Sequence, residues 1–249
     1  MKTPTLYLVA AALTLTPAAR AAVTENFTHT SPLAADGTIY LDNVNGDIDI
    51  IAWDKAEVSL EAEKKGKTDE DLKKVTLEID SSPGKLSIKT KYAKKSGWLF
   101  GSINASVRYK LMVPVGVRLQ KIDTVNSDIT VTGVRGSVNL DTVNGSITAT
   151  GLAANARLDS VNGSLSAEFA SLDGVSEVKL DSVNGRASVT LPKGASARID
   201  ADSINGRVSV DQQIRLGKAR RHSLTGEIGT GGPNISLETV NGAISVKEK

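Results

Sequence analysis

The sequence predicts an all-β fold, a single-domain β-solenoid (β-helix) built from coils of ~18–22 residues. A pentapeptide of the form Asp-x-Val-Asn-Gly recurs along the chain. Between residues 126 and 241 its asparagine position returns in steps of 18, 18, 22, 21, 20 and 16 residues. Short runs that alternate apolar and polar residues flank each copy, as half-buried strands do. Glycines and prolines separate these runs, so one period holds two or three short strands and leaves no room for a helix.

The repeat is most constant at its asparagine, and a degenerate copy at residues 222–226 fills the one long gap. Leucine-rich repeats have a similar period but a different frame, and propeller blades need ~40 residues or more. A solenoid coil, stacked on the next at ~4.8 Å through parallel strand pairing, fits the period better. The asparagines that we assign to the structural corner of each coil are Asn45, Asn126, Asn144, Asn162, Asn184, Asn205 and Asn241.

The middle of the pentapeptide is predicted to turn the chain. In the copy at residues 141–145 we expect Val143 and Ile147 both to point inward, which places a corner at Asn144-Gly145. Glycine accepts the positive φ that a tight corner requires. An asparagine at the same corner of every coil can bond the next one along the stack, forming a ladder.

The repeat also stacks its aspartates into a column. The structural interpretation is that they accept backbone N–H bonds at the bend. The alternative is a column that binds Ca²⁺ or sugar hydroxyls, although the calcium-binding nonapeptide of other solenoids does not occur in this sequence.

Residues 22–121 are less regular than residues 122–249. We interpret them as irregular N-terminal capping coils of one continuous domain, with one helical turn over residues 68–74. Charge is segregated here, because residues 22–63 hold one basic and nine acidic residues, whereas residues 64–121 hold 14 basic and five acidic residues. Lysines at 85, 89 and 91 are expected to share one face, which either discourages further strand pairing or meets an anionic partner.

Residues 1–21 are predicted to be a signal peptide that is cleaved near Ala21. Lys2 precedes a short apolar run, and Ala19-Arg20-Ala21 has the small residues of a cleavage site. The apolar run is shorter than the ~20 residues that span a bilayer, so a retained anchor is the weaker alternative. We therefore expect an exported protein, periplasmic or on the cell surface. Without this segment the chain has 28 basic and 28 acidic residues, which does not favour binding to nucleic acid.

Two segments that depart from the repeat are candidates for partner binding. The first is a loop that places aromatic and apolar residues beside lysines, in a chain with few aromatic residues; it either plugs the end of the solenoid or contacts a membrane or another partner. The second is a basic insertion before Gly226, which is either a solvated turn or a loop extruded for contact. The candidate partner-binding residues are Lys94, Lys95, Trp98, Leu99, Phe100, Arg215, Lys218, Arg220 and Arg221.

No set of residues in the sequence has the marks of a catalytic site. The two histidines, His29 and His222, are far apart, and neither an H-E-x-x-H nor a G-x-S-x-G motif occurs. The lack of cysteine excludes thiol catalysis, cysteine-ligated zinc and a lipoprotein anchor. We expect no catalytic residues, no metal site and no cofactor. A β-helix enzyme that degrades polysaccharides remains an alternative, but it needs a local cluster of carboxylates, whereas the repeat spreads them evenly.

The export signal, the Val-Asn-Gly repeats and the Gly-rich later coils, roughly residues 40–247, resemble the bacterial putative-adhesin β-solenoid family, a domain of unknown function. The resemblance implies adhesion at the surface or envelope and supplies no catalytic residues. The leading hypothesis is a non-enzymatic envelope scaffold that binds an envelope protein, a glycan or a lipid surface. Self-association through the solenoid ends is a further alternative.

Overall fold

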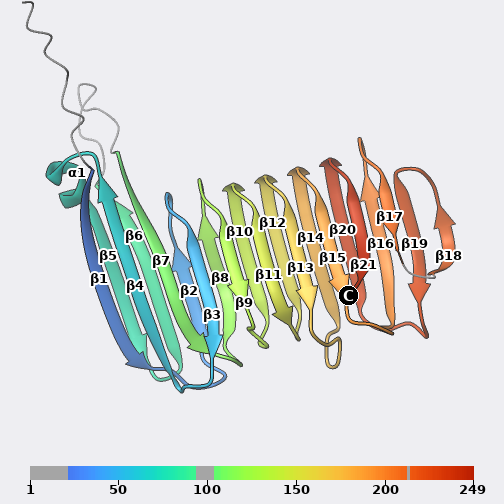
Figure 1. The fold of residues 1–249 in the computed structure, drawn as a ribbon, viewed down its shortest axis with the longest axis horizontal. Helices are drawn as coiled ribbons and strands as arrows, with labels where there is room; N and C mark the ends of the chain where they lie inside the picture. Colours follow the sequence, from blue (N-terminus) through green and yellow to red (C-terminus); the bar gives the residue numbers. More distant parts are fainter. Residues whose placement is uncertain (1–21, 94–103, 212–213) are drawn as a thin grey trace, which may run out of the picture.

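The computed structural model describes residues 22–93, 104–211 and 214–249, and these are all-β apart from one short helix. Their strands lie side by side across the long axis of an extended rod (Figure 1). They form two sheets, of ten and eleven strands, that enclose one continuous hydrophobic core. The predicted all-β, solenoid-like architecture is confirmed.

The ten-stranded sheet carries the second strand of each regular coil. Its strands, in spatial order, are β1 (Val23–Pro32), β4 (Glu57–Gly66), β7 (Ala105–Pro114), β3 (Ile48–Trp53), β9 (Ile129–Thr132), β11 (Ile147–Leu152), β13 (Leu165–Phe169), β15 (Ala187–Leu191), β21 (Ile244–Glu248) and β17 (Val208–Val210).

The eleven-stranded sheet carries the first strand of each regular coil. Its strands, in spatial order, are β18 (Ile214–Ala219), β19 (Ser223–Ile228), β16 (Ala197–Ser203), β20 (Asn234–Asn241), β14 (Glu177–Asn184), β12 (Ala156–Asn162), β10 (Val138–Asn144), β8 (Arg118–Thr124), β2 (Thr38–Asp42), β6 (Lys85–Tyr92) and β5 (Val75–Ser82). The helix α1 (Asp69–Lys73) lies between β4 and β5 in the chain, over the segment where one helical turn was predicted.

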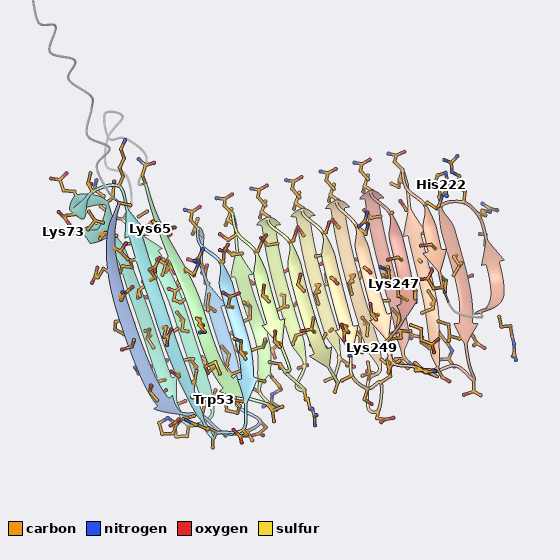
Figure 2. The ribbon with its side chains drawn as sticks, in the orientation of Figure 1. Trp53, Lys65, Lys73, His222, Lys247 and Lys249 are labelled. Atoms are coloured by element: carbon orange, nitrogen blue, oxygen red, sulfur yellow. The ribbon has the colours of Figure 1, made fainter. Side chains whose placement is uncertain are left out.

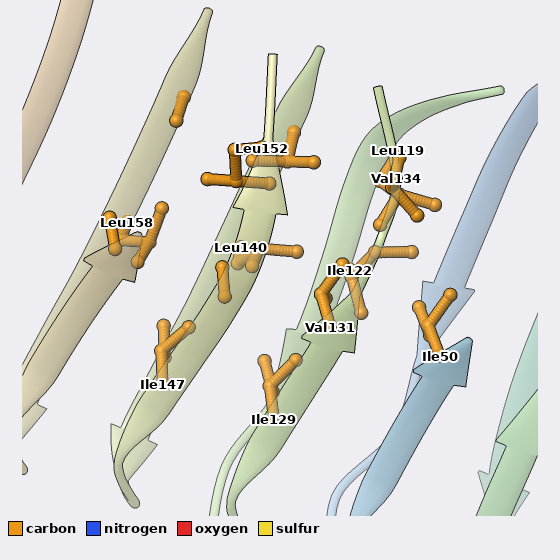
Figure 3. Packing of buried hydrophobic residues seen from close by; sticks show 14 of the residues in the cluster. Ile50, Leu119, Ile122, Ile129, Val131, Val134, Leu140, Ile147, Leu152 and Leu158 are labelled. Atoms are coloured by element: carbon orange, nitrogen blue, oxygen red, sulfur yellow. The ribbon is translucent and has the colours of Figure 1, made fainter. Parts of the chain in front are cut away.

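Each regular coil gives one strand to each sheet, and the pentapeptide joins the two. Parallel pairing places equivalent residues of successive coils next to each other along the rod. Leu140 lies beside Leu158, and Ile147 lies beside Leu165. These side chains are fully buried, and the close-up in Figure 3 shows Leu140, Leu158 and Ile147 among the packed core residues. Period-2 alternation therefore buries one face of β10, β11, β12 and β13, as expected for strands that pack on a core.

The strand alternation corrects one prediction for the corner. Val143 points outward and is 39% exposed, and Val161 and Val183 are exposed to a similar degree. The inward position belongs to Thr142 instead, which is 5% exposed and donates to the carbonyl of Ser127 at 3.1 Å. A hydroxyl can be buried here because the corner of the preceding coil supplies its acceptor.

The coils are not stacked in chain order at either end of the rod. The last coil, β20 with β21, lies between the coil of β14 and β15 and the coil of β16 and β17. At the other end β2 lies between β8 and β6, and β3 lies between β9 and β7, although β6 and β7 come later in the chain. The last coil of the described chain is thus held on both sides, whereas the first strand, β1, pairs only with β4.

Antiparallel strands flank the stack of parallel coils at both ends. β1, β4 and β7 pair antiparallel in one sheet, and β5 pairs antiparallel with β6 in the other. At the far end β19 runs antiparallel to both β16 and β18. Among the residues that the structure describes, no helix is both long and apolar enough to cross a bilayer. The predicted signal peptide, residues 1–21, lies outside the described residues.

Candidate functional site

The predicted corner asparagines stand in one column along the rim of the rod. Each of them except Asn45, which only accepts, donates its side-chain amide to the side-chain oxygen of a neighbour at 2.8–2.9 Å. In spatial order the ladder runs through Asn45, Asn126, Asn144, Asn162, Asn184, Asn241 and Asn205. Six such bonds fix the stacking register at the corner, and each adds about 0.5–1.5 kcal/mol by the usual net value of a hydrogen bond.

The corner glycines are needed for a different reason from the one that the sequence suggests. Positive φ occurs at Gly46, but not at Gly145, Gly163 or Gly185. A Cβ at Gly163 would instead overlap the carbonyl oxygen of Gly145 in the next coil, and the same overlap recurs at the other two. The prediction of a positive φ is therefore wrong for these corners. Glycine is needed there because the stacked backbones approach so closely that no side chain fits between them.

A groove of about 860 Å³ runs along the outer face of the eleven-stranded sheet, across successive coils. Two rows of outward side chains line it, and we call it the acidic groove. Its carboxylate row, in spatial order, is Asp42, Asp123, Asp141, Asp159, Asp181, Glu238 and Asp202. Its aliphatic row, two residues further along each strand, is Val125, Val143, Val161, Val183, Val240 and Ile204.

Stacked carboxylates repel one another, and part of this charge is compensated within the sheet. Lys121 contacts Asp123 at 2.8 Å, Lys179 contacts Asp181 at 3.1 Å, and Arg157 contacts both Asp159 and Asp181. The carboxylates beside Lys121 and Lys179 raise the pKa of both lysines. The column is therefore a ladder of acid–base pairs over part of its length, rather than a row of free acids.

Asp141 is the carboxylate in the middle of this column that lacks such a partner among the described residues. Asn139 occupies the position that a base takes in the neighbouring coils. Burial, followed by the charges of Asp159 and Asp123, raises the pKa of Asp141 to about 6. Burial also raises the pKa of Asp159.

This raised pKa makes a testable prediction for stability. Asp141 binds its proton more tightly in the folded chain than in the unfolded chain. Its contribution to stability therefore falls as the pH rises from about 4 through about 6. Asp141→Asn should raise the melting temperature at pH 7.5 by up to about 4 °C, for an effect of at most about 1 kcal/mol after solvent screening. At pH 4 the variant and the wild type should melt alike.

Calorimetric melting curves over pH 4–8 test this expectation. Asp80→Asn is the matched control, because it removes a carboxylate from the outer strand β5, away from the groove. An equal gain for both variants would assign the effect to general charge and not to the column.

The basic insertion forms part of the far edge of the rod. Arg215 and Lys218 lie on β18, the outer strand of its sheet, and Arg220 and Arg221 lie in the turn to β19. Neither the solvated turn nor the extruded loop describes residues 214–219, because they pair antiparallel with β19 and complete the sheet. All four cations are exposed, and none forms an ion pair within the described part of the chain. We call this set the basic edge.

The lysine face near the other end is already engaged. Lys89 pairs with Asp42 at 3.4 Å, Lys91 pairs with Glu78 at 2.5 Å, and Lys85 lies over the ring of Tyr40. The aromatic loop, with Lys94, Lys95, Trp98, Leu99 and Phe100, lies outside the described residues. Of the predicted partner-binding sets, the structure places only the basic edge.

The aliphatic row was not predicted from the sequence as a surface feature. Strict alternation from the buried Leu140 would have placed Asp141 and Val143 together on the outer face. Within the described ranges, no group of three or more histidine, aspartate or glutamate side chains is arranged to hold a metal ion. The carboxylate column is a surface that can attract cations.

Comparisons with known proteins agree with this fold. A family model described as Toastrack DUF4097 matches residues 114–247. A structure of a putative cell adhesion protein from Clostridium sporogenes is 14% identical, with 90% of this chain and 100% of that chain covered, at a TM-score of 0.53. This likeness shows the fold alone.

Two further structures are more distant. A putative adhesin from Bacteroides fragilis is 14% identical over 90% of this chain and 97% of its own, at a TM-score of 0.38. A putative lipid binding protein from Parabacteroides distasonis is 15% identical over 89% of this chain and 96% of its own, at a TM-score of 0.30. No curated protein matches the chain.

Proposed function

This chain belongs to the Toastrack DUF4097 family, and we propose that it is a non-enzymatic, exported envelope protein whose rod adheres to an anionic surface through the basic edge. The observation that carries the proposal is the set of four exposed cations without ion-pair partners at one end of the described rod. Such cations attract phosphate or carboxylate groups, and each is worth about 1 kcal/mol near an anionic lipid surface. The adhesin names of the distant structures make adhesion the first binding role to test.

The rod suits this role because it presents its end rigidly. Parallel pairing continues from coil to coil between β8 and β20, with one register shift between β8 and β10, and the asparagine ladder follows the same coils. Binding through the edge therefore needs little ordering of the scaffold, which keeps the entropic cost of association low. The predicted signal peptide would deliver the rod to the compartment where envelope lipids and acidic glycans are found.

Charge reversal tests the proposal. Replacing the four cations of the basic edge by glutamate should weaken binding to vesicles with anionic lipids, or to an acidic polysaccharide, by more than tenfold at 0.15 M salt. Co-sedimentation with vesicles of neutral and mixed composition, and titration with the polysaccharide, separate the two sources of anionic groups. The matched control replaces four exposed cations elsewhere on the rod, at Lys110, Arg135, Lys193 and Lys247. If both variants lost the same amount of binding, the basic edge would not be the binding surface.

Two alternative functions have weaker support. A polysaccharide-degrading enzyme would need a concentrated set of acids and bases, whereas the groove repeats one carboxylate per coil along the sheet. Self-assembly through the rod ends would use the outer strands β1, β5, β17 and β18. Of these, β17 has only three residues and β18 carries cations, and both features discourage pairing between edges.

A further inference from the structure

The aliphatic row of the acidic groove is a surface that the adhesive role does not use. Val143, Val161 and Val183 are 39–41% exposed, and Ile204 is 68% exposed. Coils repeat at ~4.8 Å, so the six-membered row forms a continuous apolar stripe of roughly 24 Å. A contiguous exposed stripe of this kind marks a binding groove more often than scattered surface residues do.

The groove beside this stripe has more acceptors than donors. Asp141, Asp202 and Glu238 form no ion pair with a described residue, although Glu238 accepts a weak bond from Ser236. One oxygen each of Asp123 and Asp181 also has no hydrogen-bond partner. A ligand that fits the groove must therefore donate hydrogen bonds and carry positive charge next to an apolar surface.

Charge excludes two ready occupants of the stripe. A second copy docked on the same face would set one carboxylate row against another, and like charges across an interface cost several kcal/mol. An anionic membrane would be repelled for the same reason. The occupant must be a cation with apolar segments.

Spacing separates two cationic classes. The carboxylates recur at ~4.8 Å along the rod, whereas same-face side chains of an extended peptide recur at ~6.6–6.8 Å, so a peptide along the rod drifts out of register within two or three coils. Two nitrogens joined by three methylenes lie about 5 Å apart, as four bonds of ~1.5 Å in zigzag give. A polyamine chain can follow the column, with its methylenes over the valines.

We propose that the acidic groove binds a linear aliphatic polyamine along the rod, with its ammonium groups at the carboxylate row and its methylenes on the aliphatic row. The basic edge lies on strand β18 and its turn, and contributes none of the groove-lining residues. The groove therefore adds a second binding site to the proposed adhesive role and does not depend on it.

Isothermal titration of the full protein with norspermine, a tetramine whose nitrogens are all joined by three methylenes, at pH 7.5 and low salt tests the inference. We expect saturable binding at one site. Asp141→Asn with Asp202→Asn should weaken it by tenfold or more, whereas Asp36→Asn with Asp80→Asn, two exposed acids outside the groove, should leave it within twofold. Val161→Thr with Val183→Thr keeps the side-chain shape, removes apolar surface, and should weaken binding severalfold.

Several outcomes would overturn the proposal. Equal binding of Mg²⁺ at matched charge would reduce it to general screening, and tighter binding of an alternating Lys-Val peptide would make the occupant a polypeptide. An unchanged affinity in the valine variant, or no saturable binding by the wild type, would also overturn it. Vesicle binding by the two aspartate variants should equal that of the wild type, so failure here and failure of the adhesive edge are distinguishable. Melting curves of every variant confirm that the rod is folded.

Discussion

Replacing Gly163 by alanine is expected to destabilise the rod by on the order of 3–5 kcal/mol, in the range that marks a severe single substitution. The new Cβ would overlap the backbone carbonyl of Gly145, and this atom cannot swing aside as the end of a side chain can. Relief requires the two coils to separate at the corner. The Asn144–Asn162 bond and the bond from Gly163 N to the carbonyl of Asn184 at 3.0 Å would then be lost or weakened.

Urea unfolding of the purified chain measures this effect as a lower midpoint. Gly84→Ala is the matched control, because a Cβ there meets nothing within 4 Å and the residue has no positive φ. Its change should be within about 1 kcal/mol, and of either sign. If both variants unfolded at the same midpoint, the close stacking of corner backbones would be wrong.

The repeat alone was sufficient to find the corner and its column of asparagines. Asn144 and Asn162 lie at equivalent positions because one pentapeptide recurs, and parallel stacking then brings the two amides together. Which side chains face inward was harder to predict, because hydrophobicity ranks Val143 above Thr142. Alternation, and an acceptor for Thr142 on the neighbouring coil, outweigh that ranking. The sequence does not show this acceptor, because it belongs to a different coil.

The order of the coils could not be predicted from the pattern. Every coil buries a similar set of side chains, so the coil of β14 could pack against either the coil of β16 or the coil of β20. The repeat period gives no reason for β20 to lie between β14 and β16. The basic edge shows a related limit. Residues 214–219 alternate weakly, and they become a strand because β19 offers an open edge with which to pair. Long-range pairing decides both features, and local sequence carries little information on it.

Replacing Leu237 by alanine tests this coil order and should cost about 2–5 kcal/mol, the usual loss for a leucine in a closed core. Leu237 is fully buried in β20, in register with Leu180 on one side and Ala201 on the other. The small Ala201 cannot fill the space left by the substitution. If the coils were stacked in chain order, the same residue would lie in the last coil, where a cavity can relax toward solvent.

Two further leucines calibrate the measurement. Leu180→Ala changes a coil inside the stack and should lower the free energy of unfolding about as much as Leu237→Ala does. Leu224 is half-buried on β19 near the end of the rod, so Leu224→Ala should lower it less than half as much. Hydrogen exchange adds a second readout, since weakening β20 should expose the amides of β16 and β19 together with those of β20. The interleaved order would be contradicted if Leu237→Ala lost no more stability than Leu224→Ala and the amides of β16 stayed protected from exchange. Because β20 is the only described strand that pairs with both β14 and β16, a large coupled loss would mean that the last coil of the chain holds the far end of the rod in place.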